Sequence, residues 1–108
     1  MAWEITWNGS SVNYTFGEED FSIDEITRIN RKSFDEPSGG YKEPNDSVMV
    51  DVYEAITEHG TFEWTVTAKC EGFNGYADID DVQQTKEPKG CTTEIPVFEI
   101  ENESSENL

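Results

Sequence analysis

Basic residues are scarce in this chain. It has seven lysines and arginines against 24 aspartates and glutamates, and the formal net charge is -17 over 108 residues. Charge of this sign repels nucleic acid phosphates and anionic membrane surfaces, which argues against direct binding to DNA, RNA or lipid. The acids are not confined to one tail, because residues 1–27 hold six acids and residues 90–108 hold five.

Long apolar runs are also absent. No stretch approaches the ~20 residues that a membrane-spanning helix needs, and the start MAWEITW has no basic, apolar signal region. We therefore expect a cytoplasmic protein. Its two cysteines, Cys70 and Cys91, are expected to be free thiols there, and a disulfide is the alternative in an oxidising compartment.

Aromatic residues are what the chain has in quantity. Three Trp, four Tyr and six Phe supply enough apolar area for one cooperative core in a chain of this length. We expect a single domain over residues 1–100, followed by a disordered acidic tail over residues 101–108.

Alternating apolar and polar residues predict several strands. Residues 3–7 and 12–16 alternate on either side of Asn8-Gly9, which favours a β-hairpin with one aromatic face. Residues 61–69 alternate as well and predict a half-buried strand. Shorter apolar runs predict two more strands, over residues 76–79 and 95–100.

Two segments are expected to be helical. Residues 21–34 begin with a capping box, formed by Ser22 and Glu25, and carry a rough apolar stripe. Residues 48–59 fit either a strand or a helix, and we favour the helix because Gly60 suits the position after its end. Between these segments, residues 35–47 predict a long exposed loop. The predicted class is α+β, with an N-terminal β-hairpin, one or two helices and an antiparallel sheet.

Groups for catalysis or metal binding are few. The chain has one histidine and none of the usual hydrolase, P-loop or zinc-protease motifs. His59, Cys70 and Cys91 do not match the spacing of zinc ligands. The run Asp78-Ile79-Asp80-Asp81 resembles a calcium cluster but lacks the other EF-hand positions, so a solvated acidic turn is the better interpretation. We expect no enzyme, no metal and no cofactor.

The charge itself is the feature that points to a function. Many carboxylates on a rigid domain can imitate the phosphates of a nucleic acid and compete for a basic cleft of a partner protein. The simpler explanation of so many acidic residues is that they only keep the protein soluble. If the acids do bind a partner, we expect the contacts to come from the acids that cluster in the sequence: Glu18, Glu19, Asp20, Asp24, Glu25, Asp78, Asp80 and Asp81.

The segment WEITWNGSSVNYTFGEEDFSIDEITRI resembles the opening of small acidic phage tail-assembly chaperones, with a short hairpin, an acidic turn and an acid-capped helix. This resemblance implies binding to an elongated tape-measure protein during virion assembly. The residues alone favour a different function, a non-enzymatic nucleic-acid mimic, inhibitor or immunity protein that docks on a basic nucleic-acid-binding enzyme or toxin. A phage chaperone or other small virion-assembly protein is the alternative, and a carboxylate-based enzyme is third.

Overall fold

The computed structural model describes residues 3–36, 45–71 and 76–102, and every regular element in them is a β-strand. The predicted α+β class is therefore wrong, and the described residues include no helix suited to crossing a bilayer. The strands are β1 (Trp3–Trp7), β2 (Val12–Phe16), β3 (Glu19–Ile23), β4 (Thr27–Glu36), β5 (Asp46–Thr57), β6 (Gly60–Cys70), β7 (Ala77–Lys86), β8 (Cys91–Thr93) and β9 (Phe98–Asn102).

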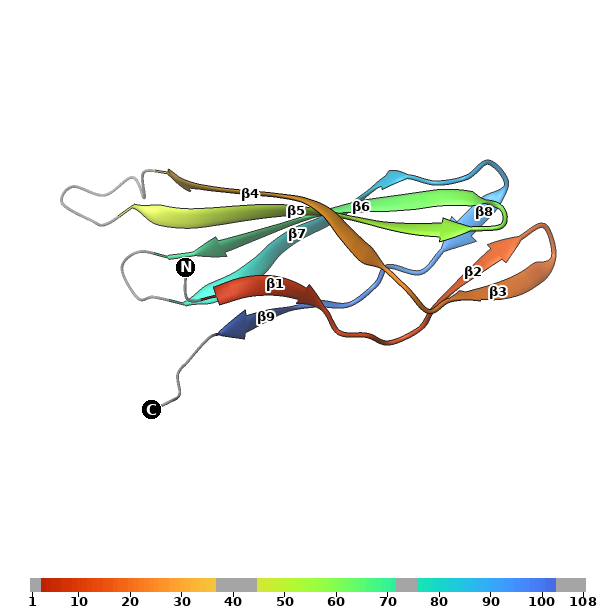
Figure 1. Ribbon diagram of the computed structural model, residues 1–108, viewed down its shortest axis with the longest axis horizontal. Coiled ribbons are helices and arrows are strands. Elements are labelled where there is room, and N and C mark those ends of the chain that lie inside the picture. Colours follow the sequence, from red (N-terminus) through yellow and green to blue (C-terminus); the bar gives the residue numbers. More distant parts are fainter. Residues whose placement is uncertain (1–2, 37–44, 72–75, 103–108) are drawn as a thin grey trace.

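The strands form two layers around one core (Figure 1). One layer is a four-stranded antiparallel sheet in the order β4-β5-β6-β7, and the other consists of two smaller sheets, β1-β9 and β3-β2-β8. Aromatic pairs connect the layers, with ring centroids 5.0 Å apart for Tyr14 and Phe62 and 4.8 Å apart for Tyr53 and Phe98. The fold is a β-sandwich whose two layers bury each other's apolar faces.

The predicted N-terminal hairpin is wrong in its pairing, although both of its strands exist. β1 pairs with β9, whereas β2 pairs with β3 and β8. Backbone hydrogen bonds from Asn8 to Val97 and from Glu94 to Asn13 link these sheets, so β1-β2 and β8-β9 run as one bent antiparallel ribbon. Buried residues lie at odd positions in β1 and at even positions in β2. The chain between β1 and β2 therefore forms a bend within this ribbon, not a hairpin turn.

Residues 21–34, which were predicted to be a helix, instead form the end of β3 and most of β4. The segment contains three isoleucines and one threonine, and their branched side chains fit a pleated strand better than a helix. On β4, Arg31 is half-buried while its neighbours Asn30 and Lys32 are exposed. The burial of Arg31 between two exposed residues follows the alternation of a strand.

Residues 48–59, for which we favoured a helix, belong to β5 and to the turn that leads into β6. Met49, Tyr53 and Ala55 are buried on the inner face of this strand, and Val48 is buried on the outer face. Because a strand of the sheet interior can be apolar on both faces, its residues also produced a helix-like spacing.

The strand predicted over residues 61–69 is confirmed as part of β6. Its inner residues, Phe62, Trp64, Val66 and Ala68, have no exposed surface and form the centre of the core. The strands predicted over residues 76–79 and 95–100 also exist, as β7 and β9, although β7 extends to Lys86 and β9 begins only at Phe98. β9 continues to Asn102, into the predicted tail, while residues 103–108 and most of the predicted loop 35–47 lie outside the described residues.

A half-buried arginine, Arg31 on β4, joins the two layers. Asp51 on β5 is fully buried and accepts two hydrogen bonds from Arg31, each 2.8 Å long. Arg31 also donates to Glu4 Oε1 at 2.9 Å and to the carbonyl oxygen of Ile5 at 3.1 Å, both on β1. The hydrogen bond to Asp51 is the main cause that raises the pKa of Arg31. The guanidinium therefore stays charged and holds β1 against the sheet.

Candidate binding site: an acidic groove beside an aromatic cluster

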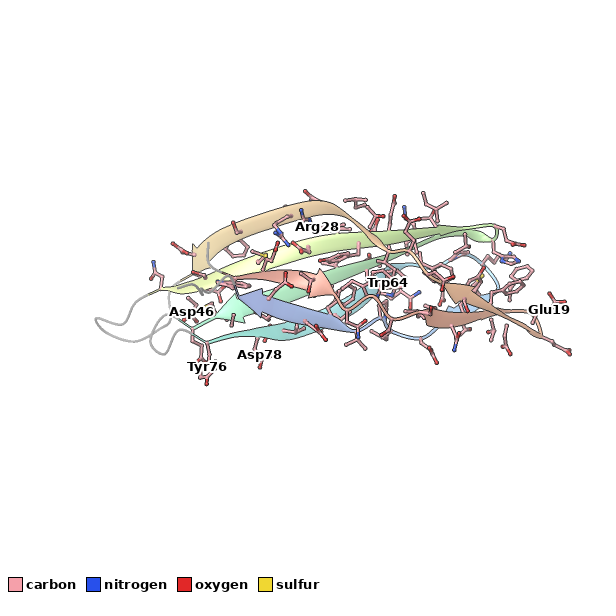
Figure 2. All side chains as sticks on the ribbon, turned by 60° about the horizontal axis from the view of Figure 1, so that its bottom comes forward. Glu19, Arg28, Asp46, Trp64, Tyr76 and Asp78 are labelled. Carbon is pink, nitrogen blue, oxygen red and sulfur yellow. The ribbon has the colours of Figure 1, made fainter. Side chains whose placement is uncertain are left out.

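The eight acids predicted to contact a partner lie in separate places, and all of them are exposed. The end of β2 is followed by Glu18, Glu19 and Asp20, and the connection from β3 to β4 contains Asp24 and Glu25. The strand β7 contains Asp78, Asp80 and Asp81. The run from Asp78 to Asp81 is therefore not an acidic turn but part of a strand. Figure 2 shows Glu19 and Asp78 toward opposite ends of the longest axis, which extends 55 Å. The structure does not gather the eight acids into one cluster.

Asp24 and Glu25 do border a groove, of about 350 Å³, beside the end of β5. The opposite wall contains two more acids, Glu54 and Glu58. Residues from β2, β3 and the start of β4 complete the lining. We call this feature the acidic groove and define it by Asp24, Glu25, Glu54, Ile56, Thr57 and Glu58.

The groove exists because β4 does not follow β5 to its end. Pairing between these strands starts at Thr27 and Glu54, and the chain before Thr27 crosses to β3 in the other layer. Ile26, which is buried, anchors that crossover in the core. Residues 55–57 of β5 consequently pair with β6 and, within the described chain, with no strand on their other side.

The carboxylates of the groove have few partners of their own. None of the described residues that line it is basic. Within the described chain, the carboxylates of Glu25 and Glu54 make no hydrogen bond or ion pair, whereas Asp24 accepts a 2.6 Å hydrogen bond from Ser11. Ile56 is 77% exposed beside them. Negative charge next to an apolar surface suits a lysine or arginine, which has an apolar stem and a cationic head.

An aromatic cluster fixes the turn that carries Glu58. His59 lies in the same turn, and its ring centroid is 4.3 Å from that of Phe16 and 4.6 Å from that of Phe21. Its Nδ1 atom is 2.8 Å from the hydroxyl oxygen of Tyr14. Because Tyr14 and Phe21 also line the groove, these contacts hold both of its walls in place.

Other chemistry has little support in the described residues. Among them, no three histidine, cysteine, aspartate or glutamate side chains are arranged as metal ligands. Cys70 and Cys91 are free thiols, and burial raises the pKa of each above its ordinary value. A raised pKa lowers the thiolate fraction at neutral pH and so disfavours a nucleophilic role.

Sequence reasoning found only half of the acids in the groove. Glu54 and Glu58 were missed because they fell inside a predicted helix, where each occupied an unremarkable polar position. The strand alternation of β5, which places Glu54 and Ile56 on one face, is the signal that would have linked them.

Comparisons of the chain with protein-family models, with curated proteins and with solved structures found no match. The resemblance of the N-terminal third to phage tail-assembly chaperones stays a prediction. Function is therefore inferred from the geometry and the charge of this chain.

Proposed function

We propose that this chain is a non-enzymatic acidic protein that docks on a basic surface of a partner protein. The observation that carries the proposal is the acidic groove, which places four carboxylates on fixed walls without a basic side chain among its described lining residues. A lysine or arginine of the partner enters it. Such a surface competes with nucleic acid for a basic cleft, so the expected partner is a nucleic-acid-binding enzyme or a basic toxin.

The remaining exposed acids support the same function at longer range. They extend the negative charge along a domain 55 Å long, which corresponds to roughly 16 base pairs at 3.4 Å each. A field of this kind steers a basic partner toward the groove and is screened by salt. We place the protein in the cytoplasm, where thiols such as Cys70 and Cys91 stay reduced.

Affinity capture with three forms of the protein tests this proposal. The wild type is compared with a groove variant, Glu54→Gln/Glu58→Gln, and with a far-end variant, Asp78→Asn/Asp80→Asn. Both variants lose two charges, but only the first changes the groove. Proteins retained from a lysate of the source cell are eluted with increasing NaCl and identified by mass spectrometry.

We expect the wild type and the far-end variant to retain the same basic protein, and salt to elute it. The groove variant should lose it. The partner is then purified and tested for displacement of its nucleic acid by the wild type. Equal loss from both variants, or no retained basic protein, would overturn the role of the groove.

A second candidate, a phage tail-assembly chaperone or other small virion-assembly protein, is favoured by a different observation. The outer face of β4 and β5 carries apolar side chains, with Phe34 48% exposed and Val50 and Val52 half-buried. A chaperone binds mainly through apolar contacts, so its complex would survive high salt. Retention of a long structural protein that depends on Phe34 but not on the groove acids would support this function.

A further inference from the structure

We propose that the acidic groove binds its partner by β-strand addition, in which an extended basic segment pairs with the open edge of β5 at residues 55–57. This inference rests on the proposed function. It adds the conformation of the bound segment and the pattern of residues that the groove recognises.

The open edge is a consequence of the sheet topology. Residues 47–54 of β5 have β4 on one side and β6 on the other, whereas residues 55–57 have β6 alone within the described chain. The acidic groove lies on the other side, where the next strand of the sheet would continue. An unpaired strand edge is a template for an extended peptide, whose main chain supplies the hydrogen bonds.

This part of β5 is already fixed in an extended conformation. Thr57 pairs with Gly60 across the turn, and its Oγ1 atom donates to the Gly60 carbonyl oxygen at 2.8 Å. The same Oγ1 accepts a 3.1 Å hydrogen bond from the amide of His59. Little ordering of the protein is then needed on binding, which favours affinity.

The side chains at the edge define a sequence pattern for the segment. Glu54 and Ile56 lie two residues apart, on the outer face of β5. Because Thr27 already occupies the position opposite Glu54, a segment paired with residues 55–57 places an apolar residue opposite Ile56. Two positions away, toward the turn, it places a basic residue beside Glu58. Asp24 and Glu25 on the facing wall add negative charge. The preferred segment is therefore basic-x-apolar in an extended conformation.

A capped pentapeptide, Lys-Thr-Val-Thr-Lys, is a suitable probe. Alternate residues of an extended chain direct their amides to the same side. N-methylation of both threonines therefore blocks one edge of the peptide, and N-methylation of the valine blocks the central amide of the other, without changing any charge. Affinity is measured by titration calorimetry, and protection of the amides of residues 54–58 by NMR hydrogen exchange.

We expect the unmethylated peptide to slow exchange of at least one amide in residues 55–57 by tenfold or more. One methylated peptide should bind at least tenfold more weakly, and the other should stay within about threefold. The Glu54→Gln protein should bind all three peptides more weakly.

Other outcomes separate the two proposals. If both methylated peptides bind like the parent while Glu54→Gln weakens all of them, strand addition is wrong and capture of a basic segment stands. If the parent peptide does not bind, both proposals fail. Protection of the β4 edge would place the bound strand elsewhere and overturn this inference. Protection of residues 55–57 that rises with protein concentration alone would identify a second copy of the chain as the occupant, and would overturn it too.

Discussion

Replacing Arg31 by methionine removes the charged partner of a fully buried carboxylate. Asp51 then loses two 2.8 Å hydrogen bonds and keeps the Tyr53 hydroxyl at 3.1 Å. Breaking a buried pair from one side costs about 3–5 kcal/mol, because the remaining charge is left desolvated. The lost bond to the Ile5 carbonyl oxygen adds about 1 kcal/mol. The loss of stability is therefore dominated by Asp51.

Urea unfolding measures this loss directly. Domains of this kind have free energies of unfolding of about 5–15 kcal/mol, so Arg31→Met should remove a fifth of the stability or more. With an m-value of about 1–3 kcal/mol/M, the midpoint should fall by at least about 1 M. Arg28→Met is the matched control. Arg28 lies 3.9 Å from Glu4 with both side chains largely exposed, so its loss should cost at most about 1 kcal/mol.

A double variant, Arg31→Met/Asp51→Leu, separates the buried charge from the packing of the arginine. Apolar replacement of a whole buried pair is often neutral or stabilising, so the double variant should be more stable than Arg31→Met. The comparison of the two variants remains informative even if Arg31→Met does not fold, because the double variant should then still fold. If Arg31→Met loses no more stability than Arg28→Met, or if the double variant is no more stable than the single one, the buried charge of Asp51 does not dominate the loss.

Three further predictions follow from burial and backbone geometry. Cys91 is 5% exposed and Cys70 is half-buried, so a maleimide should label Cys70 first and Cys91 only on unfolding. Mass spectrometry of the native protein follows the labelling, and equal labelling rates of the two cysteines would contradict this prediction. Burial, reinforced by Asp51, raises the pKa of Tyr53, so its contribution to stability is complete below about pH 10 and is lost as the pH rises further. Urea midpoints between pH 8 and 11 should show this slope, and Tyr53→Phe should reduce it. Gly60→Ala places a Cβ 2.9 Å from Pro88 at a φ of +133°, whereas in Gly9→Ala, at a φ of +88°, the new Cβ meets open space. Gly9→Ala should therefore cost only the backbone strain of about 1–2 kcal/mol, and Gly60→Ala should lower the melting temperature more. Equal shifts of the melting temperature would show that the contact with Pro88 relaxes.

Sequence patterns predicted the parts of this fold in which a single face is buried. β6 alternates strictly and its strand was predicted correctly, because period-two burial has no helical counterpart. β5 is apolar on both faces, so its spacing also fitted a helix. The capping box at Ser22 and Glu25 is a local signal, and the burial of Ile23 and Ile26 against other strands outweighed it.

Pairing between strands was harder to predict than the strands themselves. Asn8-Gly9 is a strong hairpin signal, yet β1 and β2 pair with strands from the other end of the chain. Contacts of that range leave no local trace in the sequence. The acidic groove has the same origin, because Glu25 and Glu54 meet only where β4 parts from β5.

The central claim is that the acidic groove binds basic side chains, and a titration with labelled hexalysine tests it most directly. Fluorescence anisotropy gives the Kd for the wild type, the groove variant and the far-end variant at 50 and 300 mM NaCl. Two exposed ion pairs contribute up to about 1 kcal/mol each, so the groove variant should bind about tenfold more weakly at low salt. The far-end variant should stay within about threefold of the wild type. Equal affinities of the two variants would contradict the account, because the acids would then act only through net charge.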